Sequence, residues 1–178
     1  MGTRSGSLDP GVLLYLLRRK GLTVEQLDHA LNYESGLLGL SGISSDMRQI
    51  LKEASNSPDA RLALEVYIHR LVQTIAAMAA TLGGVDGLVF TAGVGENSAQ
   101  VRELVCENLG HLGLELDTTA NGRCKPDADI ASRTSPGRIL VISSREDLTI
   151  LRETRQVIRS DARWKSPPRE LELASETV

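Results

Sequence analysis

Aromatic residues are scarce in this sequence, at 3% of its 178 residues. A hydrophobic core must therefore be built mostly from leucine, valine, isoleucine and alanine. No apolar run approaches the roughly 20 residues that a membrane-spanning helix needs, and the first residues lack the apolar stretch of a secretory signal. The net charge of −3 gives no electrostatic reason to expect nucleic acid or an anionic membrane as a partner.

Side chains that react or bind metals are also few. Cys106 and Cys124 cannot form a disulfide framework, have no partner at Cys-x-x-Cys spacing and suit a reducing compartment. His29, His69 and His111 lie far apart in the sequence, without the spacing of metal ligands. The Gly-x-Ser-x-Gly pattern of a serine nucleophile is absent. The sequence therefore predicts a soluble, cytoplasmic protein.

What the sequence does contain is ordinary for one globular domain, with 41% hydrophobic and 24% charged residues. Polar caps or prolines followed by apolar residues at helical spacing predict six helices. They begin near Pro10, Thr23, Asp46, Pro58, Val101 and Glu146. The fourth, residues 58–82, carries aliphatic side chains on both faces, so we expect it to pack on more than one side.

Short apolar runs predict the strands. Residues 87–91 and 139–142 are typical of strands buried on both faces. Residues 114–116 predict a brief third strand, residues 118–138 a turn-rich loop, and residues 161–178 a disordered tail. Strand, glycine-rich turn, helix, strand and helix indicate an α/β protein with a small, partly parallel sheet that is incomplete.

The glycine-rich turn at residues 90–98 is the first candidate site. A strand that leads through glycines into a helix start gathers free backbone N–H groups, although the same pattern also suits a plain tight turn with a helix cap. No lysine follows, which excludes a P-loop. Gly93 and Gly95 match the first two glycines of a dinucleotide fingerprint, with Asp117 about 20 residues on, but Ser98 stands at its third glycine position.

Three further segments have both a functional and a structural interpretation. Residues 143–147 could place acidic side chains near Mg²⁺ and nucleotide phosphates, or could form a capping box. Residues 44–48 could border a ligand, or could cap a helix and leave Arg48 solvated. Residues 2–6 by themselves would be a flexible terminus.

Taken together, these four segments resemble one family, the acetate kinases. Residues 1–10 are similar to the family's stretch that ends in Asp-Pro, and residues 32–42 to its Leu-Asn-x-Glu-Ser-Gly-Leu-Leu-Gly-x-Ser-Gly segment. Residues 90–98 resemble its Phe-Thr-Ala-Gly-Ile-Gly-Glu-Asn-Ser adenosine motif, with Val94 as a mild change. The match runs in order from residue 1 to about residue 155.

The resemblance implies the fold of the acetate- and sugar-kinase, heat-shock ATPase and actin superfamily. Residues 1–160 would be the C-terminal nucleotide-binding domain, a partial ribonuclease-H-like (actin-like ATPase) α/β domain that is rich in helices and has a small, incomplete mixed sheet. The family's N-terminal domain has no counterpart here. The implied reaction is phosphoryl transfer from ATP to acetate, giving acetyl phosphate and ADP, with this fragment inactive alone because half of the cleft is missing.

The resemblance also assigns roles to residues. Arg4 would clamp the transferring phosphoryl group, and Glu146 would orient Mg²⁺. ATP or ADP would lie between two walls of the cleft. These walls consist of Asp46, Met47 and Arg48 on one side and Gly93, Val94, Gly95 and Asn97 on the other. The implied partners are acetate, a nucleotide, and either a second copy in a homodimer or an N-terminal kinase half.

Four positions depart from the family pattern. Ser7 stands where an acidic residue is usual, Ser144 and Arg145 replace a Thr-Asn pair, and Asp147 shortens a second glutamate. Two alternatives remain: a catalytically inert remnant or interaction module of the same fold, and part of a related butyrate or propionate kinase.

Overall fold

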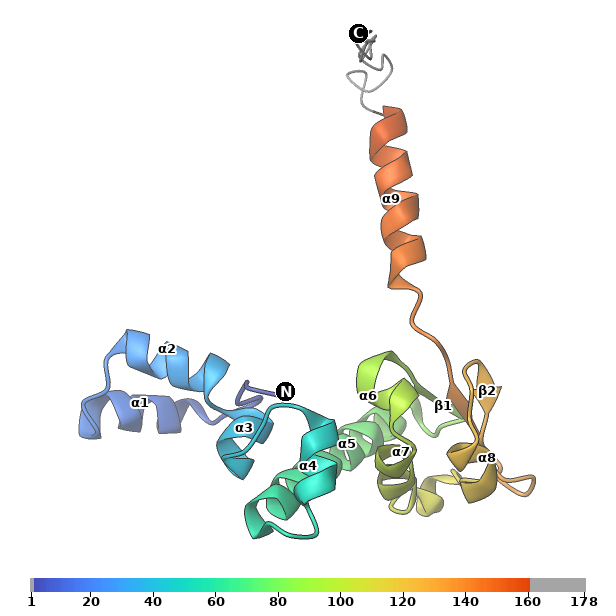
Figure 1. Ribbon diagram of the computed structural model, residues 1–178, viewed down its shortest axis with the longest axis horizontal. Coiled ribbons are helices and arrows are strands. Elements are labelled where there is room, and N and C mark those ends of the chain that lie inside the picture. Colours follow the sequence, from blue (N-terminus) through green and yellow to red (C-terminus); the bar gives the residue numbers. More distant parts are fainter. Residues whose placement is uncertain (1, 161–178) are drawn as a thin grey trace, which may run out of the picture. The chain divides into compact units, whose positions relative to one another are not determined.

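The computed structural model describes residues 2–160 of the chain (Figure 1). Two compact units divide the chain, Met1–Ile142 and Ser143–Val178. The tail predicted at residues 161–178 lies outside the described residues. Among residues 2–160, no helix combines the length and apolar character needed to cross a membrane.

The first two helices form a hairpin whose predicted caps are present. Helix α1 spans Pro10–Arg19 and α2 spans Val24–Tyr33. The Asp9 carboxylate accepts a backbone hydrogen bond at the start of α1. At α2, the backbone N–H of Gln26 donates to the Thr23 hydroxyl and the backbone N–H of Thr23 donates to the Gln26 side chain, the reciprocal pair of a capping box.

Helix α5, Pro58–Leu82, is the long helix that the sequence predicts. It packs against α3 (Gly36–Ser41), α4 (Met47–Glu53) and α7 (Ala99–Cys106). Helix α3 was not predicted, because its six residues lie within a glycine-containing segment that reads as the end of α2. The contacts of α5 with three helices make it the element around which the first unit is organised.

The sheet has three strands in the order β1–β3–β2. Strand β1 (Gly87–Phe90) pairs in parallel with β3 (Arg138–Val141), and β3 pairs antiparallel with the short β2 (Ala128–Asp129). The expected small mixed sheet of a helix-rich α/β protein is therefore confirmed. Strand β1 is at the edge of this sheet.

Only one face of the sheet is fully buried. The parallel register places Leu88 and Phe90 on the same face as Ile139 and Val141, and the last two are not exposed at all. Val89 is on the opposite face and is 51% exposed. The expectation that β1 is buried on both faces is thus wrong, because no element of the first unit covers the face that carries Val89.

The segment after β1 is more helical than the sequence suggests. Residues of the glycine-rich turn form a short helix, α6 (Ala92–Asn97), directly before α7. The predicted loop at residues 118–138 contains another helix, α8 (Thr118–Gly122), as well as β2. The brief strand expected at residues 114–116 is reduced to a single bridge between Leu116 and Ala131.

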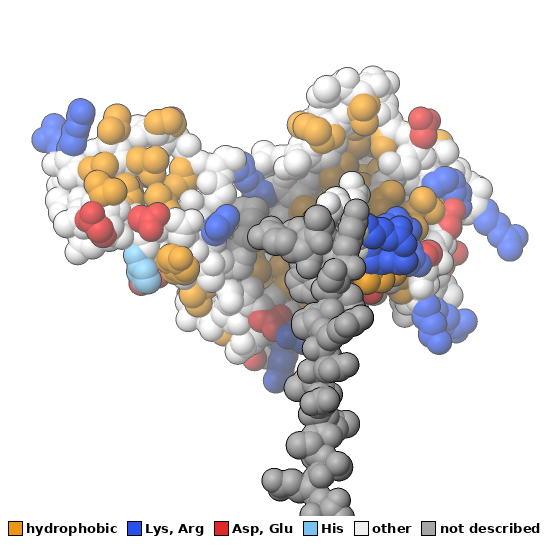
Figure 2. All heavy atoms as spheres, turned by 90° about the horizontal axis from the view of Figure 1, so that it is seen from above, with side chains coloured by type: hydrophobic (Ala, Val, Ile, Leu, Met, Phe, Trp, Pro, Cys, Tyr) orange, Lys and Arg blue, Asp and Glu red, His pale blue; other side chains and the backbone are white. Residues whose placement is uncertain are grey.

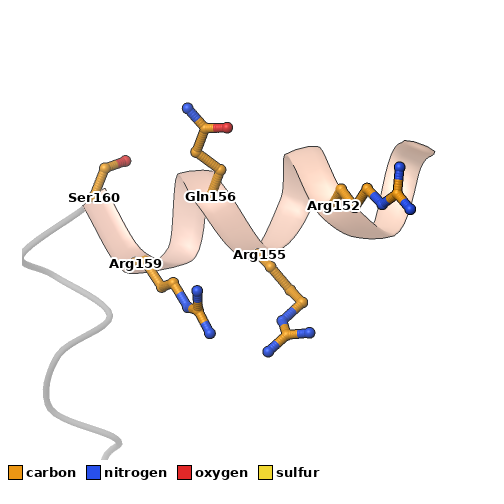
Figure 3. Close-up of a pocket in the computed structure, with 5 residues that line it drawn as sticks. All are labelled: Arg152, Arg155, Gln156, Arg159 and Ser160. Atoms are coloured by element: carbon orange, nitrogen blue, oxygen red, sulfur yellow. The ribbon is translucent and has the colours of Figure 1, made fainter. Parts of the chain in front are cut away.

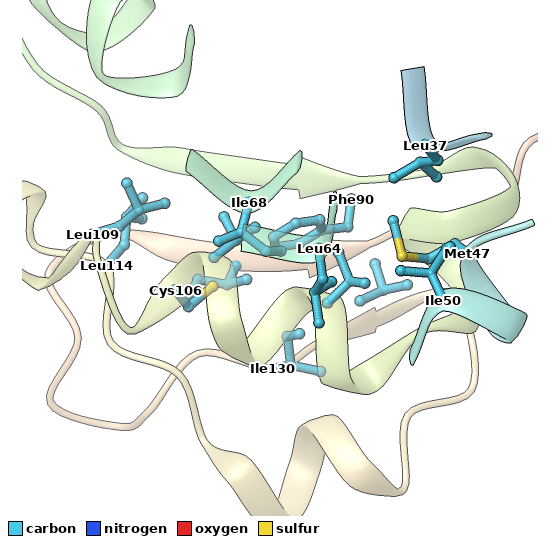
Figure 4. Close-up of a cluster of buried hydrophobic side chains, with 14 of the residues drawn as sticks. Leu37, Met47, Ile50, Leu64, Ile68, Phe90, Cys106, Leu109, Leu114 and Ile130 are labelled. Carbon is cyan, nitrogen blue, oxygen red and sulfur yellow. The ribbon is translucent and has the colours of Figure 1, made fainter. Parts of the chain in front are cut away.

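One hydrophobic cluster joins the helices to the buried face of the sheet (Figure 4). Its members come from α3, α4, α5, α7, β1 and β3 and from the loops between them. The largest side chains that are fully buried are Ile50, Leu109, Leu114, Ile130, Ile139, Val101, Val105 and Val141. As expected from the composition the core is aliphatic, with Phe90 as the one phenylalanine of the sequence.

The second unit contains helix α9, Glu146–Ser160, which begins where the sequence predicts. None of its residues is buried, and Leu148, Ile150, Leu151, Val157 and Ile158 are exposed. Packing among residues 143–160 therefore does not cover the apolar side chains of α9.

Candidate functional site

A cleft of about 640 Å³ lies between the start of α4 and helix α6. Residues from both elements line it, and six of them were predicted from the sequence to bind a nucleotide. Its lining consists of Ser45, Asp46, Met47, Arg48, Leu51, Gly93, Val94, Asn97 and Ser98. The structure therefore brings together two predicted segments that are more than 40 residues apart in the sequence.

The wall at α4 is organised by Asp46. Its carboxylate accepts the backbone N–H of Arg48, which caps the helix, and also pairs with the Arg48 guanidinium at 2.6 Å from Nη2 to Oδ2. These hydrogen bonds, that of the Arg48 side chain above all, lower the pKa of the Asp46 carboxyl. The Arg48 side chain is 90% exposed, so the pair holds a cation at the mouth of the cleft.

The turn before α4 is held by a buried hydroxyl. The Ser41 Oγ, in a residue only 4% exposed, accepts the backbone N–H groups of Ile43 and Ser44. The Ser44 Oγ in turn accepts the backbone N–H of Asp46. This chain of contacts fixes the backbone that presents Asp46 to the cleft.

The N-terminal segment is held beside this wall, so the flexible terminus suggested by residues 2–6 alone is not what forms. The backbone N–H of Leu38 donates to Gly2, that of Ser35 to Thr3, and that of Ser5 to Leu31. A Cβ at Gly2 would lie 2.9 Å from the Ser45 carbonyl oxygen, so the segment touches the turn that lines the cleft. Arg4, between these anchors, is exposed and does not line the cleft itself.

The opposite wall is helix α6. It starts with Ala92 at φ +59°, a conformation unusual for a residue with a side chain. The Ala92 backbone N–H, one of the groups expected to be free, donates instead to the Glu96 carboxylate at 2.8 Å. The Asn97 side-chain amide donates to the Gly93 carbonyl. Side chains of α6 thus satisfy its own backbone.

The two glycines of α6 have different surroundings. A Cβ at Gly93 would meet no atom within 4 Å, and Gly93 lines the cleft. A Cβ at Gly95 would lie 3.4 to 3.5 Å from atoms of Phe90. Gly95 therefore packs at ordinary contact distance against the end of β1 and does not line the cleft, although the sequence grouped it with Gly93.

Arg102 is a residue near the cleft that the sequence did not predict, as are the lining residues Ser45, Leu51 and Ser98. It is 2% exposed, and its guanidinium donates to the carbonyls of Gly95 and Glu96 in α6. It also donates to the side chain and carbonyl of Asn121 in α8. Burial lowers the pKa of the Arg102 guanidinium. Nothing in the local pattern of α7 separates this arginine from a surface one.

Glu146, the predicted Mg²⁺ residue, belongs to the second unit. Its Oε1 accepts a hydrogen bond from the Ser144 hydroxyl at 3.3 Å. Within residues 2–160 there is no group of three or more histidine, cysteine or acidic side chains that could hold a metal ion. A carboxylate of this kind suits an Mg²⁺ that is bound mainly through phosphates and water, which is how Mg²⁺ usually binds nucleotide enzymes.

A second hollow on the described residues is formed by α9 alone. Arg152, Arg155, Gln156, Arg159 and Ser160 line it. Figure 3 shows Arg155 and Arg159 pointing to one side of the helix and Gln156 and Ser160 to the other. Because these side chains diverge from one exposed helix, they do not converge on a ligand, and the cleft between α4 and α6 is the stronger candidate.

The cleft combines apolar surface with a few polar groups, as ligand sites in proteins usually do. Met47 is 5% exposed and belongs to the core, so this side of the cleft is rigid. Val94 and Leu51 add half-buried aliphatic surface. Arg48 supplies a planar cation that can stack on an aromatic ring, and Asn97 supplies an amide.

Comparison with known proteins relates most of the chain to one family. The acetokinase family profile matches residues 1–152. Acetate kinase from Gloeobacter violaceus is 53% identical over 160 residues, which are 89% of this chain and 40% of that protein. Acetate kinase from Nostoc punctiforme is 50% identical over 161 residues, 90% of this chain and 40% of that protein. The chain thus spans about 40% of the length of these relatives.

Solved structures give the same result at the level of the fold. The crystal structure of Porphyromonas gingivalis acetate kinase superposes with a TM-score of 0.81 at 38% identity, covering 89% of this chain and 40% of that one. A propionate kinase from Francisella tularensis gives a TM-score of 0.79 at 36% identity, covering 86% and 39%. The partial actin-like ATPase fold expected from the sequence is confirmed.

Proposed function

Because this chain belongs to the acetokinase family, we propose that it supplies the adenosine-binding half of a kinase for small carboxylates. The reaction is phosphoryl transfer from ATP to acetate, which gives acetyl phosphate and ADP. The chain spans about 40% of its relatives, so we expect it to bind ATP or ADP weakly and to be inactive alone.

The observation that carries the proposal is the cleft between α4 and α6. Six residues chosen from two distant sequence segments line one hollow of about 640 Å³, a size within the usual range for ligand sites. An unrelated tight turn and an unrelated helix cap have no reason to face each other across a shared hollow. The proposal therefore rests on the convergence of two segments that each have a structural interpretation when taken singly.

Each wall has a role in holding the nucleoside. Arg48 stacks on the adenine ring, since its guanidinium is planar and exposed beside the cleft. Met47 and Val94 contact the ring edges through apolar atoms, and Asn97 with Gly93 forms the opposite side. Gly93 allows the ligand to approach the backbone, because no Cβ stands in the way.

The phosphates engage residues outside this cleft. Arg4 clamps the transferring phosphoryl group, where a forked cation matches its equatorial oxygens. The backbone anchors on both sides of Arg4 support this role because they restrict where its side chain can reach. Glu146 would hold Mg²⁺, which when bound neutralises charge on the phosphates. The role of Glu146 rests on the sequence of residues 143–147.

The acyl substrate and the partners are also part of the proposal. The relatives at 50% identity and above are acetate kinases, which supports acetate as the acyl substrate. One of the similar solved structures is a propionate kinase, so propionate is the alternative substrate. We expect the chain to pair with a second copy or with an N-terminal kinase half. The two cysteines are free thiols, which supports a location in the reducing cytoplasm.

Calorimetric titration of the purified chain with ADP and MgCl₂ tests the proposal. We expect weak but saturable binding that Gly93→Ala reduces by about tenfold, because the new Cβ enters the open space at the cleft. Gly110→Ala is the matched control, since a Cβ there also meets nothing within 4 Å but the residue is outside the cleft. Equal affinity of Gly93→Ala and Gly110→Ala for ADP would show that the nucleotide does not bind in the cleft.

An inert interaction module of the same fold is the second candidate. It is favoured by the large apolar side chains exposed on the α1–α2 hairpin, among them Val12, Leu14 and Tyr15. A folded chain that shows no heat of binding with ADP, ATP or either nucleotide with MgCl₂ would support this alternative against the first.

A further inference from the structure

We infer that Arg102 and Asn121 form a buried brace that fixes the shape of α6 and thereby positions one wall of the cleft. Arg102 is a positioning residue in this inference. It touches the backbone of α6, and α6 touches the ligand. The link to the nucleotide rests on the function proposed above, whereas the brace itself does not.

Arg102 uses most of its hydrogen-bonding capacity within the protein. Nη1 donates to the Gly95 carbonyl at 2.9 Å and to the Glu96 carbonyl at 2.8 Å. Nε donates to Asn121 Oδ1 at 2.7 Å, and Nη2 donates to the Asn121 carbonyl at 3.1 Å. Four of the five N–H groups of the guanidinium are therefore engaged.

Asn121 completes the connection to α7. Its side-chain amide donates to the Ala99 carbonyl at 2.9 Å, and the residue is 2% exposed. The two side chains thus tie α6, the start of α7 and α8 together, although 19 residues separate them in the sequence. Both ends of the Asn121 amide are used, so the orientation of this side chain is determined by its partners.

The charge of Arg102 is balanced by carbonyl groups. Among residues 2–160, no carboxylate forms an ion pair with it. A buried cation without a partner is strongly unfavourable, and the carbonyls of Gly95 and Glu96 are at the C-terminal end of α6, where helix carbonyls carry partial negative charge. The conformation of α6 therefore stabilises the buried guanidinium, and the guanidinium in turn stabilises this conformation of α6.

Helix α6 has few features of its own that favour a helix. None of its residues is fully buried, and Val94 is half-buried against the core. Two of its six residues are glycine, which disfavours a helix, and Ala92 starts it with a positive φ. Besides the hydrogen bonds of Glu96 and Asn97, contacts that hold α6 include the packing of Val94 against the core, the Phe90 contact of Gly95 and the hydrogen bonds from Arg102.

For the contacts of residue 102 with α6 and Asn121, the geometry of its N–H donors matters more than its positive charge. A lysine at position 102 keeps the positive charge but has one nitrogen, which cannot reach Asn121 Oδ1 and two α6 carbonyls together as a planar fork does. We therefore expect Arg102→Lys to destabilise the conformation of α6 nearly as much as Arg102→Met does. At position 121, Asn121→Asp keeps the acceptor for Arg102 Nε but loses the donor to the Ala99 carbonyl, whereas Asn121→Leu removes both at similar volume.

The test measures amide hydrogen exchange in the full chain without nucleotide. We expect Arg102→Lys and Asn121→Leu to speed exchange of the α6 amides by about tenfold or more, which corresponds to 1.4 kcal/mol. Exchange in β3 should stay unchanged. Asn121→Asp should retain more of the protection than Asn121→Leu, because it keeps the acceptor for Arg102 Nε. Arg138→Lys is the control, because Arg138 is an exposed arginine whose ion pair with Asp129 is outside α6.

A second measurement, of ADP affinity with MgCl₂, connects the brace to the site. We expect affinity to fall by about tenfold in the variants that loosen α6 and to fall less in Asn121→Asp than in Asn121→Leu. Unchanged α6 exchange in Arg102→Lys would overturn the brace, and so would faster exchange spread evenly over β3 and α5. Faster α6 exchange with unchanged affinity would overturn the positioning role. A wild-type chain that binds no ADP would overturn the proposed function, with the brace still decided by exchange alone.

Discussion

Among single residues, Gly137 shows how tightly the loops around the sheet are packed. A Cβ at this position would lie 2.9 Å from Leu114 Cδ2 and 3.3 Å from the Val85 carbonyl oxygen. Leu114 is not exposed at all, and the backbone oxygens of Gly113 and Val85 are both 3.3 Å from the same Cβ position. The position therefore requires the absence of a side chain, because two segments cross there at backbone distance.

We predict that Gly137→Ala lowers the free energy of unfolding by about 1–3 kcal/mol, the usual cost of inserting a methyl group into a filled core. Gly122→Ala is the matched control. A Cβ at Gly122 meets nothing within 4 Å, and alanine favours the helix that this residue ends. Urea denaturation followed by circular dichroism measures both. Equal midpoints for the two variants would contradict the crossing at Gly137.

Asp46 provides a prediction for pH. Its pKa is lowered in the folded chain, first by the Arg48 side chain, and returns to about 3.9 on unfolding. The stabilising contribution is therefore complete above that value and is lost as the pH falls through the lowered pKa. We expect the wild type to lose more thermal stability than Asp46→Asn between about pH 5 and pH 2, with a smaller difference at high salt. Parallel curves would show that the carboxylate adds nothing.

Site residues differed in how far the sequence could predict them. Asp46, Arg48 and Gly93 lie in short segments that carry a recognisable pattern, so their grouping could be predicted. Arg102 and Asn121 could not, because their role arises from a contact between α7 and α8 that no local pattern encodes. An arginine in an amphipathic helix is usually solvated, and only the tertiary fold shows this one to be buried.

At the scale of elements, helices with strong caps were predicted and short ones were missed. Helices α1, α2, α4 and α5 each follow a capping side chain, which is a local signal. Helices α3, α6 and α8 have six residues or fewer. They are too short to show helical periodicity, and all contain glycine. They form because their surroundings hold them, as Arg102 holds α6.

The end of α5 depends on backbone conformation. Gly83 caps this helix in the left-handed region at φ +77°, and its backbone N–H donates back to carbonyls in the last turn. We predict that Gly83→Ala lowers the free energy of unfolding by about 1–2 kcal/mol, the cost of a left-handed conformation for a residue with a Cβ. Urea denaturation against Gly110→Ala, whose glycine is not left-handed, checks this. If only Gly110→Ala lost stability, the left-handed cap at Gly83 would not contribute as predicted.

For the molecule as a whole, exposed apolar surface is the main feature without an assigned role. Figure 2 shows hydrophobic side chains gathered over the α1–α2 hairpin. Val12, Leu14, Tyr15 and Val24 are each 45% exposed or more. A patch of this kind on a protein surface usually marks a contact with another protein.

We predict that the chain associates with itself through this hairpin. Light scattering should give a mass above the 19.2 kDa of one chain, and Leu14→Glu together with Tyr15→Glu should return it to that value, because burying two carboxylates in an apolar contact is costly. A pair of changes at exposed polar positions, Gln73→Glu and Thr74→Glu, serves as the control. A wild-type chain that scatters as a monomer would contradict the prediction.

The uncovered face of the sheet, which carries Val89, has a consequence for the lifetime of the chain in a cell. Val89 lies in an edge strand, beside the half-buried Leu140 of β3, and no element of the first unit shields it. Molecular chaperones bind short apolar stretches in extended conformation, and an uncovered edge strand invites pairing with other chains. Chaperones that bind such stretches would therefore recognise β1 in the folded first unit as well as in the unfolded chain. A stable contact that covers β1 would prevent both kinds of binding and so extend the lifetime of the chain, independently of any effect on catalysis.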